Sequence, residues 1–366
     1  MVSGLDSRDY RCAICGGPFK TLPIAHHSRS QDEKTPERLE GVWTTGEDYW
    51  GLDPYYYDEG DVVWLNEARV LGLNSTAGLD KTRAFISGVG NIETSYGRFE
   101  ITPENRGDDP NVPGYNWRRF SCYFDDKEIE PVFPFHPCCY ELLLLNLFEE
   151  HNIQATQLDK DILYNVMFEF ATEPSSLFLA LDYGVEMSIA FEPKPGRDPI
   201  TVIPLISNES SGTMYDLSGY AALRPFDPEE YPSILSIIPP AASDPFAKLP
   251  LEILTLVASF LDTRSVFQLI GTSRMVFLAV VQNRLFWKRH LQAWYRWYFE
   301  WQKILLEDND PYLQEADLMQ IAFNLDRPER LDAIPGIIMT NRRRIWGVCD
   351  QITKRYVARH RSQHRN

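Results

Sequence analysis

The sequence predicts an α+β domain followed by an all-helical region, and three observations carry this prediction. Short runs of β-branched and aromatic residues, separated by Gly, Asn and Asp, recur between residues 62 and 124. From residue 244 onward, almost every apolar pattern has the period of a helix instead. Eleven of the 25 prolines fall between Pro193 and Pro250, and this stretch separates the two regions.

The elements of the first region follow from periodicity and from turn residues. We expect strands over four short runs, at 62–65, 70–73, 99–101 and 121–124. Apolar residues at helical spacing then predict two helices, at 137–150 and 158–170. Strands and helices segregated in this way indicate an α+β domain over residues 1–192.

The rest of the chain divides into three parts. Proline removes a backbone donor and biases its predecessor away from helix, so residues 193–243 are expected to form a proline-rich linker. Residues 244–291 read as a unit of short helices, and residues 292–366 as a helical C-terminal region with a basic tail. In that last part Trp294, Trp297 and Trp301 have the spacing of one helical face, which favours a buried stripe over a binding surface.

Composition narrows the class of protein. Of 366 residues 44% are hydrophobic and 24% charged, which is typical of a globular chain. No apolar run is long enough to cross a bilayer, and the first residues lack the pattern of a secretion signal. We therefore expect an intracellular protein, in the cytoplasm, the nucleus or both, with no membrane partner. A net charge of -16 also argues against nucleic acid as the main partner.

The acidic excess is reversed at the C-terminus, where residues 342–366 contain eight Lys or Arg and one Asp. Such a tail can contact nucleic acid or an acidic protein, or serve as a nuclear address. Because Arg342-Arg343-Arg344 is a short run, the preferred interpretation is a solvated helix end beside an acidic body.

A Cys-x-x-Cys pair, Cys12 and Cys15, is the sharpest motif of the first region. Two thiolates at this spacing can bind one tetrahedral Zn²⁺, and the glycines that follow permit a tight turn beneath the sulfurs. Zinc needs two further ligands. The chain offers them nearby, at His26 and His27, or far downstream, in the His-Pro-Cys-Cys run that begins at residue 136.

The distant source is favoured by helix geometry. Pro137 suits the first position of the predicted helix, so His136 lies just before that helix. Because Cys139 follows three residues later, the two side chains are expected to face the same direction. The candidate set is therefore Cys12, Cys15, His136 and Cys139, four ligands with no open position, which is typical of a structural zinc site. Two alternatives stay open: unliganded buried cysteines, or a thioredoxin-like dithiol, which the Gly-Gly-Pro turn disfavours.

Motifs of catalysis are missing from the sequence. It contains no phosphate-binding Gly-x-x-x-x-Gly-Lys, no Gly-x-Ser-x-Gly and no His-Glu-x-x-His. We therefore expect a protein that is not an enzyme.

The segment from residue 244 to residue 291 predicts a small helical bundle. Pro250 opens a helix with a wide apolar face, and Asp262 caps a second one. A third helix starts at Ser273, and a run beginning at Asn283 closes the unit. So short a bundle has more apolar surface than it can bury alone, which predicts a protein partner.

Residues 246–291 resemble an F-box. The resemblance is carried by Leu249-Pro250-Leu251-Glu252-Ile253-Leu254, Phe260-Leu261, Ser273-Arg274 and Leu285-Phe286-Trp287-Lys288. Val276, where the family often has an aromatic residue, and Gly271 in the second helix depart from the pattern. Cys12-x-x-Cys15-Gly-Gly-Pro-Phe, Phe135-His136-Pro137-Cys138-Cys139 and Asn341-Arg342-Arg343-Arg344-Ile345-Trp346 extend the similarity to a group of filamentous-fungal F-box proteins.

The resemblance implies a non-catalytic adaptor that recruits a protein substrate to an SCF-type cullin–RING ubiquitin ligase. The partners would be a Skp-type adaptor and, through it, a cullin scaffold. The apolar anchors expected in the adaptor groove are Leu249, Pro250, Ile253, Leu254, Leu261 and Leu269. Two alternatives remain: an F-box scaffold acting outside the ligase, and a zinc-containing nucleic-acid binder that uses the basic tail. The substrate-binding part is either the N-terminal domain or the tryptophan-rich helix.

Overall fold

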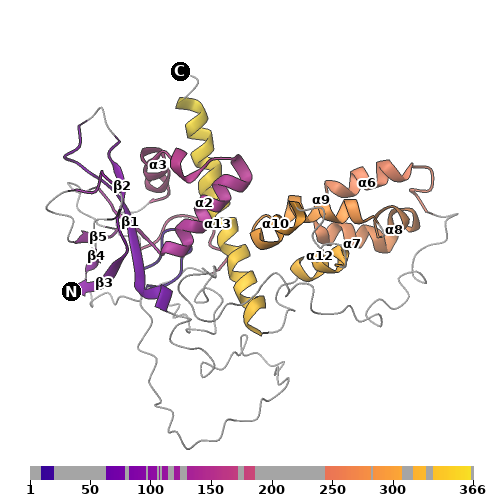
Figure 1. The fold of residues 1–366 in the computed structure, drawn as a ribbon, viewed down its shortest axis with the longest axis horizontal. Coiled ribbons are helices and arrows are strands. Elements are labelled where there is room, and N and C mark those ends of the chain that lie inside the picture. Colours follow the sequence, from indigo (N-terminus) through magenta and orange to yellow (C-terminus); the bar gives the residue numbers. More distant parts are fainter. Residues whose placement is uncertain are drawn as a thin grey trace, which may run out of the picture. The chain divides into compact units, whose positions relative to one another are not determined.

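The structure is a computed structural model (Figure 1). It describes residues 10–19, 63–78, 82–95, 98–104, 107, 109–113, 119–123, 130–171, 177–185, 244–281, 283–306, 316–326 and 333–363. The predicted proline-rich linker, 193–243, lies outside these residues. In the described parts of the chain, none of the helices combines the length and the apolar character that crossing a membrane requires.

The chain forms two compact units. The first comprises Met1–Gly212 together with Asn341–Asn366, and the second comprises Thr213–Thr340. An α+β N-terminal part followed by a helical C-terminal part is therefore confirmed. The division differs from the predicted C-terminal region 292–366, because residues from Asn341 onward belong to the first unit and residues up to Thr340 to the second.

The first unit is built on a curled antiparallel sheet of six short strands. They are β1 (Glu67–Leu73), β2 (Ala84–Ile86), β3 (Gly90–Ser95), β4 (Arg98–Pro103), β5 (Phe120–Ser121) and β6 (Phe133–Phe135). The order is β2-β1-β3-β4-β5, and β6 also pairs with β1. The predicted strand at 62–65 is wrong in its described part, since η3 (Val63–Asn66) is a 3₁₀ turn that leads into β1.

The register of β1 brings the end of β6 next to the centre of the sheet. Leu71 lies opposite Ile86 of β2 and opposite Phe133 of β6, and all three side chains are buried. Where the start of β3 pairs with the end of β4, a Cβ on Gly90 would lie 2.5 Å from the Thr102 carbonyl oxygen, so only glycine fits there. β6 ends one residue before His136, and the sheet thereby fixes the position of a candidate ligand.

Helices pack against this sheet. α2 (Pro137–His151) contacts β1, α3 (Lys160–Phe170) contacts β1 and β2, and the one-turn η4 (Ala155–Gln157) connects the two helices. α13 (Ala333–Gln363) belongs to this unit from Asn341 onward. Its Thr353 hydroxyl donates to Asn146 of α2, and its Tyr356 hydroxyl accepts from the Asp159 amide at the start of α3.

The second unit is a bundle of short helices. Its elements are α6 (Leu251–Ser259), α7 (Thr263–Thr272), α8 (Arg274–Val280), α9 (Arg284–Trp294), α10 (Phe299–Leu306) and α12 (Leu318–Asp326). The predicted starts are confirmed: Asp262, Ser273 and Asn283 each cap a helix by accepting an amide hydrogen, and Pro250 precedes α6. α8 packs on both α6 and α7, and α12 packs on α9 and α7.

The predicted tryptophan stripe does not lie on one helix. α9 ends at Trp294 and α10 begins at Phe299, so the chain turns between the first and the last tryptophan. Trp297 and Trp301 are buried, as expected of core residues, whereas Trp294 is exposed on the last turn of α9.

Candidate functional site

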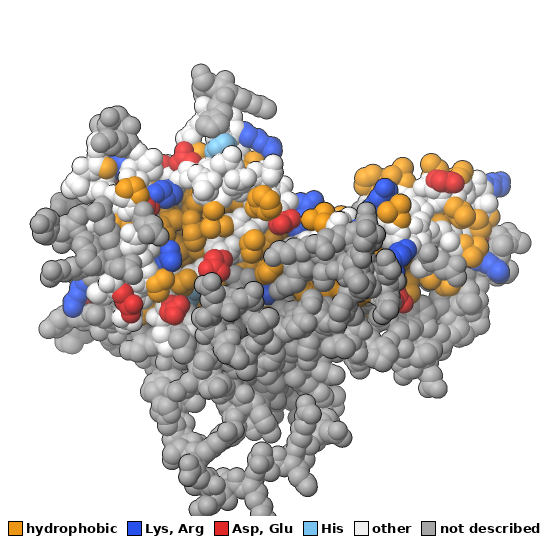
Figure 2. All heavy atoms as spheres, in the orientation of Figure 1, with side chains coloured by type: hydrophobic (Ala, Val, Ile, Leu, Met, Phe, Trp, Pro, Cys, Tyr) orange, Lys and Arg blue, Asp and Glu red, His pale blue; other side chains and the backbone are white. Residues whose placement is uncertain are grey.

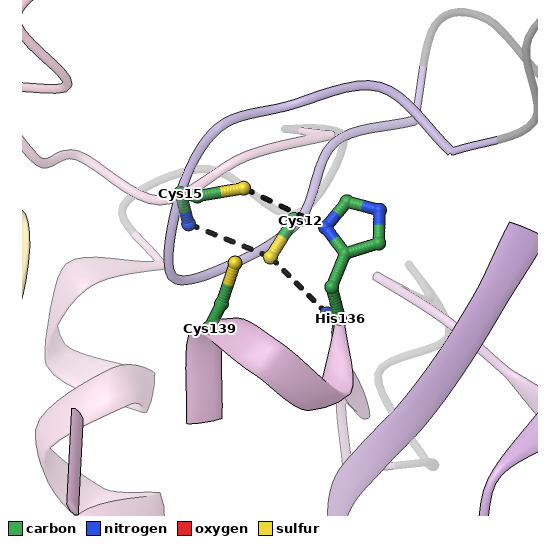
Figure 3. Close-up of side chains that lie close together, drawn as sticks. All are labelled: Cys12, Cys15, His136 and Cys139. Atoms are coloured by element: carbon green, nitrogen blue, oxygen red, sulfur yellow. Dashed lines mark hydrogen bonds between the residues drawn. The ribbon is translucent and has the colours of Figure 1, made fainter. Parts of the chain in front are cut away.

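The four predicted metal ligands come together in the first unit. The ligand atoms of Cys12, Cys15, His136 and Cys139 all lie within 4.8 Å of one another, and the four residues are completely buried (Figure 3). Cys12 and Cys15 come from a loop near the start of the chain, and His136 and Cys139 come from the N-terminal end of α2. The sheet and the helix therefore assemble one cluster from two segments more than 120 residues apart.

The loop is shaped to hold its sulfurs. The Cys15 amide donates to Cys12 Sγ over 3.4 Å, and the Gly17 amide donates to Cys15 Sγ over 3.2 Å. Gly16 makes the turn between them with a φ of 68°, which favours glycine. Amide groups that donate to sulfur stabilise thiolates, so the backbone of this loop favours negative charge on the two cysteine sulfurs.

Helix α2 supplies the other two ligands with a fixed orientation. His136 is its N-cap residue and Pro137 its first residue, as the sequence predicts, and the His136 amide donates to Cys12 Sγ over 3.4 Å. Cys139 is one turn further along the helix and is fully buried. Cys138, which points elsewhere on the same turn, is not part of the cluster.

The imidazole of His136 is held by ring packing. Its centroid lies 4.4 Å from the ring of Phe19 and 4.6 Å from that of Trp64. Nδ1 faces Cys15 Sγ at 3.6 Å, while Nε2 is buried and has no hydrogen-bond partner among the described residues. Nδ1 is therefore the nitrogen directed toward the cluster.

The geometry fits zinc. A thiolate sulfur at about 2.3 Å and an imidazole nitrogen at about 2.0 Å from a tetrahedral ion are about 3.5 Å apart. Cys15 Sγ and His136 Nδ1 are 3.6 Å apart, close to this separation. Three sulfurs and one imidazole form a closed, soft donor set with no position left for substrate, which is typical of a structural rather than a catalytic ion.

Burial alone would oppose ionisation of these thiols. It raises the pKa of both Cys12 and Cys139 well above the usual value. In Cys15 burial acts in the same direction, but hydrogen bonds from Cys12 and Cys139, together with those from His136, hold the pKa well below the usual value. The protein itself thus favours the thiolate form of Cys15. A bound divalent cation would supply the positive charge that favours the thiolate forms of Cys12 and Cys139.

The sequence did not reveal which residues surround the loop that carries Cys12 and Cys15, the candidate metal-binding loop. Arg344 of α13 donates from Nη1 to the carbonyl oxygens of Cys15, at 2.7 Å, and of Tyr183, at 2.9 Å. The Tyr183 hydroxyl in turn donates to the carbonyl of Ala13. We expected the 342–344 run to be solvated, yet Arg342 is fully buried. The missed signal is the recurrence of Ile345, Cys349, Ile352 and Tyr356, all buried, through the basic tail.

The second candidate site is the set of predicted docking anchors in the second unit. Leu249, Pro250 and Ile253 are exposed, and Leu261 and Leu269 are half-buried. Leu254 is only 1% exposed and packs inside the chain's own bundle, which is the alternative to a docking role for this residue. Leu254 and Ala258 lie on the side of α6 that packs on α8. Because the apolar face of this short helix is wide, some of its side chains are buried against α8 while others remain exposed.

Further apolar side chains extend this exposed surface. Leu251, Leu256, Val257 and Phe260 of the α6 segment, Leu278 of α8 and Leu285 of α9 are all exposed. Figure 2 shows hydrophobic side chains gathered where Figure 1 labels α6. We call this set, with Leu249 and Ile253, the α6 surface. A shallow hollow in it is lined by Leu251, Glu252, Thr255, Leu278, Ala279 and Asn283.

Comparison of the chain with models of known protein families gives no match, and comparisons with curated proteins and with solved structures give none either.

Proposed function

We propose that this chain is the substrate-recruiting F-box subunit of an SCF-type cullin–RING ubiquitin ligase. The observation that supports the proposal is the α6 surface, on which apolar side chains face solvent from three helices of one small bundle. Ile253 is 43% exposed and Phe260 75% exposed. Contiguous apolar groups of this kind are costly in water and mark sites where another polypeptide docks.

The proposed partner is a Skp-type adaptor with a hydrophobic groove. Leu249 and Ile253 would enter that groove, and Leu278 and Leu285 would border it. Leu254 would act indirectly, since its burial against the bundle keeps α6 in place. Catalysis would take place in other subunits, and this chain would hold substrate lysines near the ubiquitin carrier, which raises their effective concentration.

The metal centre has a structural role in this proposal, with zinc as the ion. The four ligands join the N-terminal loop to the start of α2, and zinc would supply the Lewis acidity that keeps the thiols ionised. The unit held in this way is the proposed substrate-binding part, because the buried Trp297 and Trp301 belong to the core of the other unit.

Of the two alternatives, the nucleic-acid binder is less well supported. Arg342 is fully buried, and the Arg344 guanidinium donates hydrogen bonds to backbone carbonyls, so these two arginines are not presented to a phosphate backbone. The F-box scaffold outside the ligase uses the same α6 surface and differs only in whether a cullin joins the complex.

The test is adaptor binding by the full-length chain and by its Ile253→Asp variant. An unpaired carboxylate placed in an apolar interface costs about 3 kcal/mol or more, so we expect affinity to fall by about 100-fold or more. Phe168→Asp is the matched control: Phe168 is also an exposed hydrophobic residue, but it belongs to α3 of the first unit.

Binding is measured by co-purification and by titration of the purified adaptor. Equal affinity of the wild type and Ile253→Asp would contradict the position of the interface, and no binding by the wild type would overturn the proposal. Adaptor binding without recruitment of a cullin would support the scaffold alternative instead.

A further inference from the structure

The C-terminal helix reaches the metal-binding loop through Arg344. One end of its guanidinium donates to the carbonyl of Cys15, a candidate ligand, and the other donates from Nε and Nη2 to Asn341 Oδ1, at 3.0 and 2.9 Å. Asn341 is fully buried on the preceding turn of α13. The cation is therefore held at both ends rather than extended into solvent.

The backbone around Arg344 also leaves it little freedom. A Cβ on Gly184 would meet Arg344 Cγ at 3.1 Å, and Gly184 has a φ of 67°, so a glycine is required where the chain passes over the arginine stem. The neighbouring Asp182 is bonded to α13 twice: its amide donates to Gln351 Oε1, and its carbonyl accepts from Gln351 Nε2. α13 thus fixes the loop that carries Tyr183.

This loop leads back to the metal centre. Tyr183 accepts from Arg344 through its carbonyl and donates from its hydroxyl to the carbonyl of Ala13, between the two loop cysteines. The carbonyl of Arg11, just before Cys12, accepts from the Tyr123 hydroxyl at 2.9 Å. The metal-binding loop is therefore held by side chains from three other segments, and α13 provides the only formal charge among these three donors.

Electrostatics explains why a positive charge is favourable beside this site. Zinc bound by three thiolates and one neutral imidazole carries one net negative charge. All four ligands are fully buried, and an uncompensated charge in such surroundings is costly. The positive guanidinium of Arg344, hydrogen-bonded to the backbone of a ligand, balances the charge of the complex.

We propose that Arg344 is the outer-shell cation of the metal centre, and that metal binding and the docking of α13 residues 341–363 onto the first unit are therefore coupled. The coupling is reciprocal, because an interaction that strengthens metal binding when the helix is docked must strengthen docking when the metal is bound. Arg344 is a positioning residue here, not a ligand. The inference rests on the proposed metal centre and not on the proposed ligase role.

The first experiment measures zinc affinity of the full-length chain by competition with a chelator. Loss of an outer-shell partner typically weakens metal binding by about 10- to 100-fold, and we expect this for Arg344→Gln. Arg344→Lys keeps the charge without the planar fork and should recover part of the affinity. Arg343→Gln is the matched control, since it removes the same charge from an exposed position of the same helix turn.

The second experiment needs no variant. Hydrogen exchange of the wild-type chain is compared with and without zinc, and peptides from residues 341–363 should lose protection when the metal is removed. Cobalt(II) substitution should give the absorption of a tetrahedral thiolate site in the wild type and in Arg344→Gln, which separates weaker binding from a lost ligand set. Equal zinc affinity in Arg344→Gln and Arg343→Gln, or unchanged protection of α13 without metal, would overturn the proposal.

Discussion

Acidification should destabilise the second unit through one buried histidine. His290 lies on α9, where its Nε2 is 2.7 Å from the Thr263 hydroxyl of α7. The Tyr295 hydroxyl lies within hydrogen-bond distance of two acceptors, 2.6 Å from the same Thr263 oxygen and 3.0 Å from the carbonyl oxygen of Ala322 in α12. Burial lowers the pKa of His290 from 6.5 to about 4, against a smaller opposing effect of Asp262.

The magnitude follows from linkage. Above pH 6.5 the imidazole is neutral in both the folded and the unfolded chain, so it contributes no pH dependence. Between pH 6.5 and pH 4 the unfolded chain binds a proton that the folded chain does not bind, and the free energy of unfolding falls as pH falls. With the two pKa values of 6.5 and about 4, the loss reaches about 2.5 kcal/mol at pH 4.5.

The assay compares the wild type with His290→Gln. The glutamine amide can hydrogen-bond to the Thr263 hydroxyl as donor or as acceptor but does not titrate, so the variant should lose this part of the pH dependence. Unfolding in urea is followed between pH 7 and pH 4.5 by hydrogen exchange of peptides from α9, which reports on the second unit alone. Thr263→Val is the control: it removes the hydroxyl but keeps the imidazole, and the pH dependence should persist.

The quantity that decides is the difference between the two pH profiles. If the wild type and His290→Gln lose stability in parallel, to within about 0.5 kcal/mol, then His290 does not have a depressed pKa in the folded chain and the reasoning is refuted.

Two further predictions concern the two candidate sites, beside those for Ile253 and Arg344. Cys139→Ser should lower zinc content below that of Cys138→Ser, measured by atomic emission, because only Cys139 belongs to the cluster; equal zinc content would contradict the ligand set. Leu254→Ala should lower the free energy of unfolding by about 2–5 kcal/mol, measured in urea, because it empties a buried position of α6. Leu256→Ala, at an exposed position of the same helix, should change it little, and similar losses in both would refute the assigned faces.

Structural features that depend on a few neighbouring residues, such as helix starts, were predicted correctly from the sequence. Pro137 and Pro250 are placed at the starts of α2 and α6, and Asp262 and Ser273 cap the next two helices, because capping and proline geometry involve only a few neighbouring residues. The turn at Val63–Asn66 was missed because an apolar run of four residues fits a strand and a 3₁₀ turn equally well.

The metal ligands were predicted although they are far apart in the chain. Thiols and imidazole are rare, and the spacing in Cys12-x-x-Cys15 and His136-x-x-Cys139 allows each pair to face one ion, so chemistry alone selected the set. The burial of Leu254 could not be predicted, because the apolar face of α6 is wide and periodicity does not show which of its side chains turns toward α8.

The candidate ligand set, the helix starts and the order of an α+β part before a helical part could be read from the sequence, since each of these depends on residue type and short-range geometry. Only the tertiary structure decided that residues 341–363 return to the first unit and that Arg344 bonds the carbonyl of Cys15. The reason is that a charged residue is solvated by default, and its burial becomes favourable only when distant parts of the chain supply acceptors and opposite charge at the same place.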